Sequence, residues 1–166
     1  MNVRPAPSEY APYFDRYISQ VPDGPILGKL TANPLEAALR AVPDEAASLR
    51  PAPGKWSLKE VLGHVIDTER IMAARALRIA RGDQTALPGF DQDPYVENAD
   101  FQRRSMESLL EELQAVRAAT AALFRWLPEE AWARTGTVSG NQTSVRALAW
   151  VIAGHELHHV NLLTRR

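Results

Sequence analysis

Residues 57–82 read SLKEVLGHVIDTERIMAARALRIARG and predict one long amphipathic helix. Ser57 and Glu60 form a capping box, because a serine cap followed three residues later by a glutamate satisfies two backbone N–H groups at a helix start. Residues spaced by three or four share one stripe that should face the protein interior: Val61, His64, Thr68, Ile71, Arg75 and Ile79. Gly82 then supplies the glycine that commonly ends a helix.

Two more long helices are expected after this one. Ser105 can cap a helix that ends at Pro128, and Thr143 or Ser144 can cap a final helix toward the C-terminus. The inward stripe of the final helix combines apolar residues with histidines: Leu148, Val151, Ile152, His155, His159 and Leu162. Residues 83–104 contain prolines, a glycine and several aspartates, and they predict a long ordered loop.

The first third of the chain should be broken into short pieces, because it holds nine of the twelve prolines. We expect a flexible tail over residues 1–9, a short helix over residues 10–20, and a further helical run after it. Pro34 either kinks that run or restarts it with Asn33 as the cap. No segment shows sustained period-two alternation, so no strand is expected.

Together these patterns predict an all-α protein with a single domain over residues 1–166. Four helices should form a bundle whose N-terminal helix is broken. The long crossover loop permits a topology other than simple up-down-up-down.

The composition excludes several classes of protein. A formal net charge of -1 lacks the basic character of a nucleic-acid binder. No run approaches the ~18 apolar residues of a membrane span, so we expect a cytoplasmic protein without nucleic-acid or membrane partners. The chain has no cysteine, which excludes disulfides, zinc–thiolate sites and a protein thiol nucleophile.

Three of the four histidines fall within five residues. His155 and His159 lie ~40° apart on one helical face, so both imidazoles can meet one ion. His64 lies on the inward stripe of another helix, and bundles build metal sites from facing helices. Taken alone, an inward histidine is more typical of a hydrogen-bonded core residue, which remains an alternative for His64. His158 lies on the flank, where it could support the site, face an interface or replace one ligand.

Residues 155–159, HELHH, also match the H-E-x-x-H signature of zinc proteases, in which the glutamate is the general base. Those proteases hold their substrate against a sheet edge and commonly take a third ligand from downstream. No sheet is expected here, and only seven residues follow His159. A protease is therefore the weaker interpretation.

Several motifs resemble those of DinB/YfiT-like proteins and together span nearly the whole chain from about residue 10. They are GKWSLKEVLGH at 54–64, DTER at 67–70, RIARGD at 78–83, LPGFDQD at 87–93 and GHELHH at 154–159. The resemblance implies a four-helix bundle that binds a divalent metal ion through His64, His155 and His159, and it implies a homodimer. Three imidazoles do not distinguish Zn, Ni, Fe, Mn or Co.

The resemblance also implies an activity. Characterised relatives include thiol-dependent transferases and an isomerase that uses a thiol such as mycothiol or bacillithiol. We therefore expect a metal-dependent transferase that adds or transfers a low-molecular-weight thiol to a small-molecule substrate. Because the chain has no cysteine, the sulfur must come from outside. A metal-dependent hydrolase and a non-catalytic, stress-associated metal-binding dimer are the alternatives.

Individual residues have expected roles in these interpretations. The nucleophile is a metal-bound thiolate or water, whose pKa the ion lowers. Arg75 lies three turns beyond His64 and could anchor a carboxylate, or it could pair with Glu69 or a loop aspartate. Asp67 and Glu156 adjoin ligands and could orient imidazoles. For Glu156, which points away around the helix, a solvated or inter-subunit carboxylate is the stronger interpretation.

Overall fold

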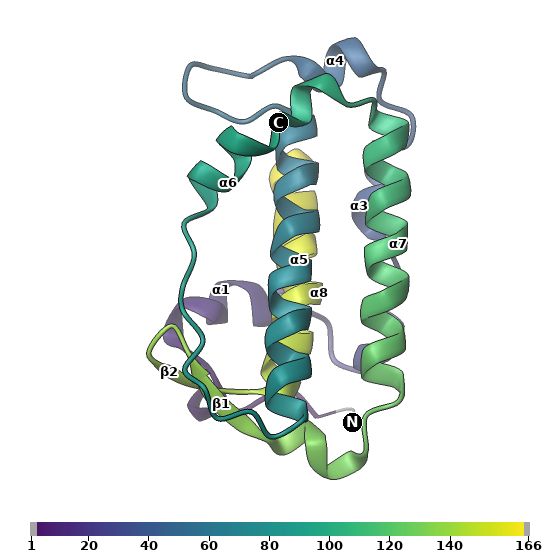
Figure 1. Ribbon diagram of the computed structural model, residues 1–166. Helices are drawn as coiled ribbons and strands as arrows, with labels where there is room; N and C mark the ends of the chain where they lie inside the picture. Colours follow the sequence, from purple (N-terminus) through teal and green to yellow (C-terminus); the bar gives the residue numbers. More distant parts are fainter. Residues whose placement is uncertain (1–2, 165–166) are drawn as a thin grey trace.

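Three long helices stand side by side in the computed structural model, which describes residues 3–164 (Figure 1). They are α5 (Leu58–Ala80), α7 (Met106–Arg125) and α8 (Val145–Thr164), and α5 packs against both of the others. Figure 1 shows α5 and α7 running in the same direction and α8 running in the opposite one. The topology is therefore not simple up-down-up-down, as the long crossover permitted.

The predicted caps begin these helices. The Ser57 hydroxyl accepts a bond from the Glu60 N–H at 3.2 Å, and the Glu60 carboxylate accepts one from the Ser57 N–H at 2.8 Å. Ser105 caps α7 in the same way. Ser144, rather than Thr143, caps α8, because its hydroxyl accepts a bond from the N–H of the third residue of that helix at 3.0 Å.

The fourth member of the bundle is a chain of short segments. They are η1 (Pro7–Glu9), η2 (Pro12–Phe14), α1 (Asp15–Ile18), α2 (Ile26–Leu30), α3 (Pro34–Leu39) and α4 (Asp44–Ser48). The segments α1, α2 and α3 pack along α8, and α2 also contacts α7. Asn33 adopts a left-handed conformation at φ 41°, which interrupts the helical run, and the new helix α3 begins at Pro34. The all-α bundle with a broken N-terminal helix is confirmed.

Most of the predicted N-terminal tail is anchored to the bundle. Arg4 donates to the carbonyl oxygens of Ile18 and Val21, each at 2.6 Å. Glu9 accepts a bond from Arg146 of α8 at 2.6 Å. Two charged side chains of the predicted tail therefore contact the rest of the protein. The first two residues of that tail lie outside the described residues.

The crossover contains more helix than expected. Within the stretch predicted as a loop, the chain forms α6 (Gln92–Ala99) and η3 (Phe101–Arg103) on its way back along the bundle (Figure 1). The ring of Phe101 packs directly on Gly63 of α5, where an added Cβ would lie 2.4 Å from ring carbons. This contact fixes the crossover against α5 at the residue before His64.

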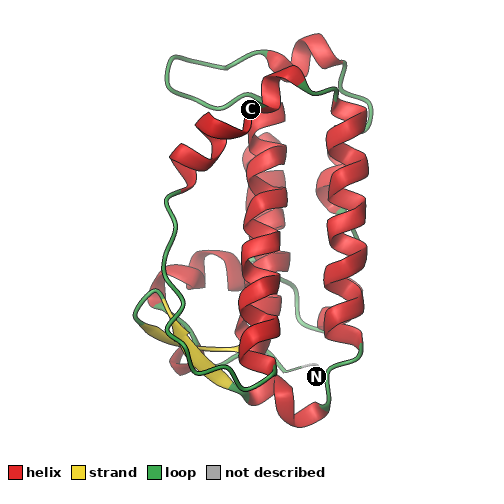
Figure 2. Cartoon of the chain, in the orientation of Figure 1, coloured by secondary structure: helices red, strands yellow, loops and turns green. Residues whose placement is uncertain are grey.

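One small β-hairpin follows the short helix η4 (Glu129–Ala133), although no strand was expected (Figure 2). Its strands β1 (Thr135–Val138) and β2 (Asn141–Ser144) pair antiparallel. The turn residues Ser139 and Gly140 have φ values of 49° and 79°, as a tight hairpin turn requires. Leu87 of the crossover pairs with Val138. The two strands read TGTV and NQTS and contain one apolar side chain between them, so neither shows the alternation that indicates a strand.

The interior consists of two apolar clusters. One surrounds Trp150 of α8 and includes residues of α1, α2, the end of α5 and the hairpin. The other includes Leu62 of α5 and Leu109 of α7 with residues of α3 and the crossover. Most positions of the inward stripes predicted for α5 and α8 are buried, whereas Ile71 is half-buried and Leu162 is 43% exposed.

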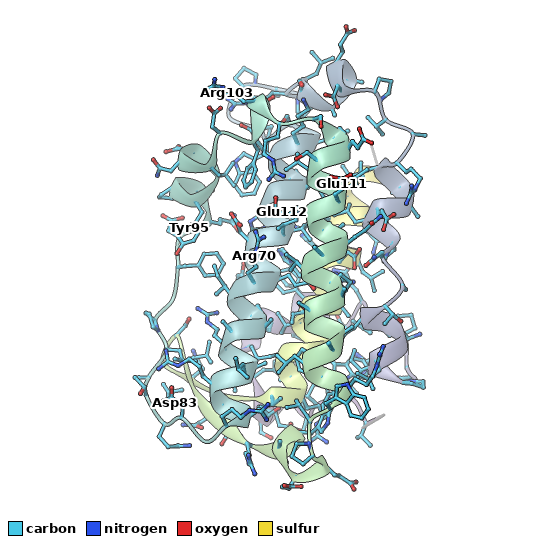
Figure 3. All side chains as sticks on the ribbon, turned by 45° about the vertical axis from the view of Figure 1, so that its right-hand side comes forward. Arg70, Asp83, Tyr95, Arg103, Glu111 and Glu112 are labelled. Atoms are coloured by element: carbon cyan, nitrogen blue, oxygen red, sulfur yellow. The ribbon has the colours of Figure 1, made fainter. Side chains whose placement is uncertain are left out.

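The outer faces of α5 and α7 carry ion pairs. Figure 3 shows Arg70 of α5 and Glu112 of α7 pointing toward one another, and their charged atoms lie 2.5 Å apart. Exposed pairs of this kind contribute only about 0–1 kcal/mol each, so packing rather than surface charge holds the bundle together. Among the helices of residues 3–164, none combines the length and the apolar character that a bilayer crossing requires.

Candidate metal centre

The three predicted histidine ligands come together between α5 and α8. His64 lies in the second turn of α5, and His155 and His159 lie one turn apart on α8. The Nε2 atom of His155 lies 3.0 Å from Nε2 of His64 and 3.2 Å from Nε2 of His159. One nitrogen from each ring lies within 4.8 Å of the others, so this cluster could hold a metal ion.

The donor set fits a divalent ion. Imidazole nitrogens bind Zn at ~2.0–2.1 Å, so two of them that subtend between a right angle and a tetrahedral angle at the ion lie roughly 2.8–3.4 Å apart. The two short nitrogen–nitrogen distances agree with that value. A neutral imidazole has one N–H and one lone pair, and three facing Nε2 atoms satisfy one another poorly without a cation between them. The residues therefore suit a divalent metal.

The imidazoles are held in the neutral form that a ligand needs. Burial lowers the pKa of the His64 imidazole to about 4. Burial, with a further effect of the neighbouring rings, lowers the pKa of His159 to about 3 and that of His155 well below its usual value. At neutral pH all three rings therefore carry a free lone pair, without competition from a proton.

Neighbouring side chains restrict the rings. The Thr68 hydroxyl lies 3.5 Å from Nδ1 of His64, on the side of the ring away from the cluster, and the Trp56 indole packs at 5.0 Å from the same ring. The Tyr17 ring packs edge-on against His155 at 5.1 Å. Thr68 was part of the predicted inward stripe, four residues after His64, and the structure places its hydroxyl beside that ring.

His158 lies outside the cluster. Its Nδ1 atom lies 3.2 Å from the side-chain amide of Gln20, and its ring packs on Tyr17. Its predicted position on the flank of the His155–His159 pair agrees with this placement. His158 therefore supports the packing around the site, and the cluster of potential ligands does not include it.

The two carboxylates considered as orienting groups both have other partners. Asp67 lies 3.5 Å from Arg70. Glu156 is only 1% exposed and accepts bonds from the Leu35 N–H at 3.0 Å and from Arg117 at 2.7 Å. The expectation of a solvated or inter-subunit Glu156 is therefore wrong. Because this carboxylate faces Arg117, it also cannot serve as the general base of a protease-like site.

Arg117 is a residue that the sequence analysis missed. It lies on α7 between two buried glutamates, with Glu69 of α5 and Glu156 of α8 each 2.7 Å away. It also donates to the Leu30 carbonyl oxygen at 3.3 Å. Arg117 lies four residues after Leu113 and three before Thr120, and both of these are buried. This helical spacing could have indicated that Arg117 faces the interior. This ion network links the three long helices in the interior.

A pocket opens beside the histidines, with a cavity volume of about 260 Å³. His64 and His155 lie in its wall, and so does Arg75. Neither expected ion pair of Arg75 forms, because Glu69 pairs with Arg117 and the guanidinium donates instead to the Pro88 carbonyl oxygen at 2.6 Å. The hairpin and the crossover close this pocket through Val138, Ser139, Gly89 and Phe90.

Comparison with known proteins identifies the family. A sequence model described as the DinB superfamily matches residues 29–163. The chain belongs to the DinB superfamily. A solved structure of YfiT from Bacillus subtilis is similar to this DinB chain with a TM-score of 0.70 and 19% identity, over 99% of this chain and 93% of that one. YfiT is described as "a probable metal-dependent hydrolase with an unusual four-helix bundle topology". No curated protein sequence matches the chain significantly.

Proposed function

We propose that this DinB-superfamily protein is a divalent-metal-dependent transferase that adds a low-molecular-weight thiol to a small molecule in the pocket. The observation that carries the proposal is the convergence of three imidazole nitrogens, two of which belong to rings that line a pocket. Three protein ligands leave a coordination position open, which is typical of catalytic rather than structural sites.

Each part of the chain has a role in this proposal. His64, His155 and His159 would hold the ion, and Thr68 and Trp56 restrict the ring of His64. When bound, the ion would lower the pKa of a thiol at the open position and so supply a nucleophile at neutral pH. The apolar wall of the pocket, which includes Met72 and Phe90, would exclude water from the sulfur.

A metal-dependent hydrolase is the second candidate, because YfiT carries that description. Hydrolysis at such sites commonly uses a carboxylate as general base, as in the H-E-x-x-H proteases. No aspartate or glutamate lines the pocket among the residues that the structure describes, and Glu156 faces Arg117 instead. The pocket therefore lacks the carboxylate base that such hydrolases use, which favours transfer over hydrolysis.

The test compares the two reactions on the same preparation. The chain, loaded separately with Zn, Ni or Mn, is given cysteine, bacillithiol or mycothiol with a small electrophile, and thiol loss is followed. We expect metal-dependent thiol loss that His155→Ala abolishes. Cleavage of a p-nitrophenyl ester by the loaded chain, without thiol, would instead support the hydrolase. An ion bound without either reaction would support a non-catalytic metal-binding protein.

The proposal includes a cytoplasmic homodimer without nucleic-acid or membrane partners. The net charge of -1 supports the absence of a nucleic-acid partner, since such proteins carry basic surfaces. Light scattering on the eluting protein measures the oligomeric state, and a monomer at micromolar concentration would contradict the dimer.

A further inference from the structure

The pocket beside the histidines contains a buried cation without a counter-charge. Arg75 is only 6% exposed, and its protein partners are the Pro88 carbonyl oxygen at 2.6 Å and the Met72 sulfur at 3.4 Å. No carboxylate pairs with it within residues 3–164, whereas Arg117, which is 2% exposed, pairs with two. We propose that Arg75 binds the carboxylate of a small organic acid, which defines the substrate class of the site proposed above.

The guanidinium has donors left for a ligand. A guanidinium carries more N–H groups than the two that Arg75 uses, and its planar fork matches a carboxylate. One of its present partners is a thioether sulfur, which is a weak acceptor. A carboxylate would therefore gain charge-assisted hydrogen bonds that the protein itself does not supply.

The charge of the whole pocket favours an anion. Among the described residues, its wall contains Arg75 and neutral side chains and no aspartate or glutamate. Its polar side chains besides Arg75 and the histidines are hydroxyls and amides: Tyr13, Tyr17, Thr68, Gln92, Ser139 and Asn141. A divalent ion on the histidines would add further positive charge. A cationic molecule would thus be repelled, while both charges would attract an organic anion.

The remaining wall fixes the size and the polarity of the rest of the ligand. Phe14, Met72, Phe90 and Val151 provide apolar surface. The cavity of about 260 Å³ lies below the ~300–1,000 Å³ typical of sites for drug-sized ligands. The pocket therefore suits a compact acid with one apolar or aromatic body.

The position of Arg75 is also held in advance. The Pro88 carbonyl oxygen binds one terminal nitrogen, and the Phe90 ring lies 5.6 Å from the guanidinium carbon. A side chain restricted in this way loses less entropy when it binds a ligand. If Arg75 served only to hold the crossover through Pro88, removal of its side chain would lower the free energy of unfolding and leave anion binding unaffected.

Calorimetric titration of the zinc-loaded chain with benzoate and with benzamide tests the inference, because the two probes share a shape and differ in charge. We expect benzamide to bind at least tenfold more weakly than benzoate. Arg75→Met should weaken benzoate binding by about 10- to 100-fold, which is the range for charge-assisted hydrogen bonds. Arg75→Lys keeps the positive charge but not the planar guanidinium, so it should lose less benzoate affinity than Arg75→Met.

Arg78→Met is the matched control on the same helix. Arg78 is exposed and pairs with Asp83 at 2.6 Å, so this variant should bind benzoate as the wild type does. Equal binding of benzamide and benzoate would overturn the inference, as would unchanged benzoate binding in both Arg75 variants. If Arg75→Met fails to fold, the benzoate affinity of Arg75→Lys and the comparison of benzoate with benzamide on the wild type still test the inference.

Repeating the titration on the metal-free chain separates this inference from the proposed function. The difference between the wild type and Arg75→Met should persist without metal, because the guanidinium binds the carboxylate directly. Benzoate binding that requires zinc and ignores Arg75 would show that the carboxylate binds the ion, and would overturn the inference. Failure of the proposed metal chemistry would leave the Arg75 result unchanged.

Discussion

Arg117→Met should lower the free energy of unfolding by about 3–5 kcal/mol, because it leaves two buried carboxylates without their cation. Glu69 and Glu156 are 2% and 1% exposed, and both contact the guanidinium at 2.7 Å. Neither carboxylate can reach water where it lies, so the lost pairing is not replaced. Urea unfolding of the metal-free chain, followed by circular dichroism, measures the effect.

Arg70→Met is the control for this prediction. Arg70 is half-exposed and pairs across α5 and α7 at the surface, so its removal should cost no more than about 1 kcal/mol. The triple variant Glu69→Gln, Arg117→Met, Glu156→Gln removes every charge of the network and should recover part of the loss. An Arg117→Met variant as stable as Arg70→Met would contradict the central role of this ion network.

Gly154→Ala should destabilise the bundle by at least ~3 kcal/mol, at the upper end of the range for overpacking. An added Cβ at this residue would lie 2.2 Å from the Tyr17 carbonyl oxygen and 2.5 Å from its carbon. Because these are backbone atoms, no side-chain rotation relieves the clash, and α1 must move away from α8. The Tyr17 ring, which packs on His155, would move with it.

Gly28→Ala provides the matched control, because its Cβ would meet nothing within 4 Å and its backbone is helical. We expect this variant to be equally stable or stabilised by up to about 1 kcal/mol. Thermal unfolding of the two variants compares them directly. Equal midpoints for Gly154→Ala and the wild type would show that α1 does not pack as closely as the structure places it.

The residue pattern predicted the features that depend on neighbours along one helix. The capping box at Ser57 and the apolar stripe defined α5, and the four-residue spacing of His155 and His159 placed both on one face of α8. The inward position of His64 then indicated the helix that faces them. These inferences needed only helical periodicity, and the structure brings the three histidines together.

Features that depend on distant partners could not be predicted in the same way. The Arg117 guanidinium meets Glu156, which lies 39 residues away on another helix, so local spacing suggested that Glu156 was solvated. The hairpin depends on the pairing of Val138 with Leu87 of the crossover, as well as on its own short strands. Likewise, only the three-dimensional structure showed that no aspartate or glutamate of residues 3–164 lines the pocket with Arg75.

Metal analysis of the purified chain, expressed without an affinity tag and dialysed, tests the central claim most directly. We expect about one equivalent of a divalent metal ion in the wild type and in His158→Ala, because three imidazoles form one site. His64→Ala, His155→Ala and His159→Ala should each retain close to none. Full metal content in His64→Ala, or no uptake by a folded wild type offered Zn or Ni, would contradict the three-histidine site.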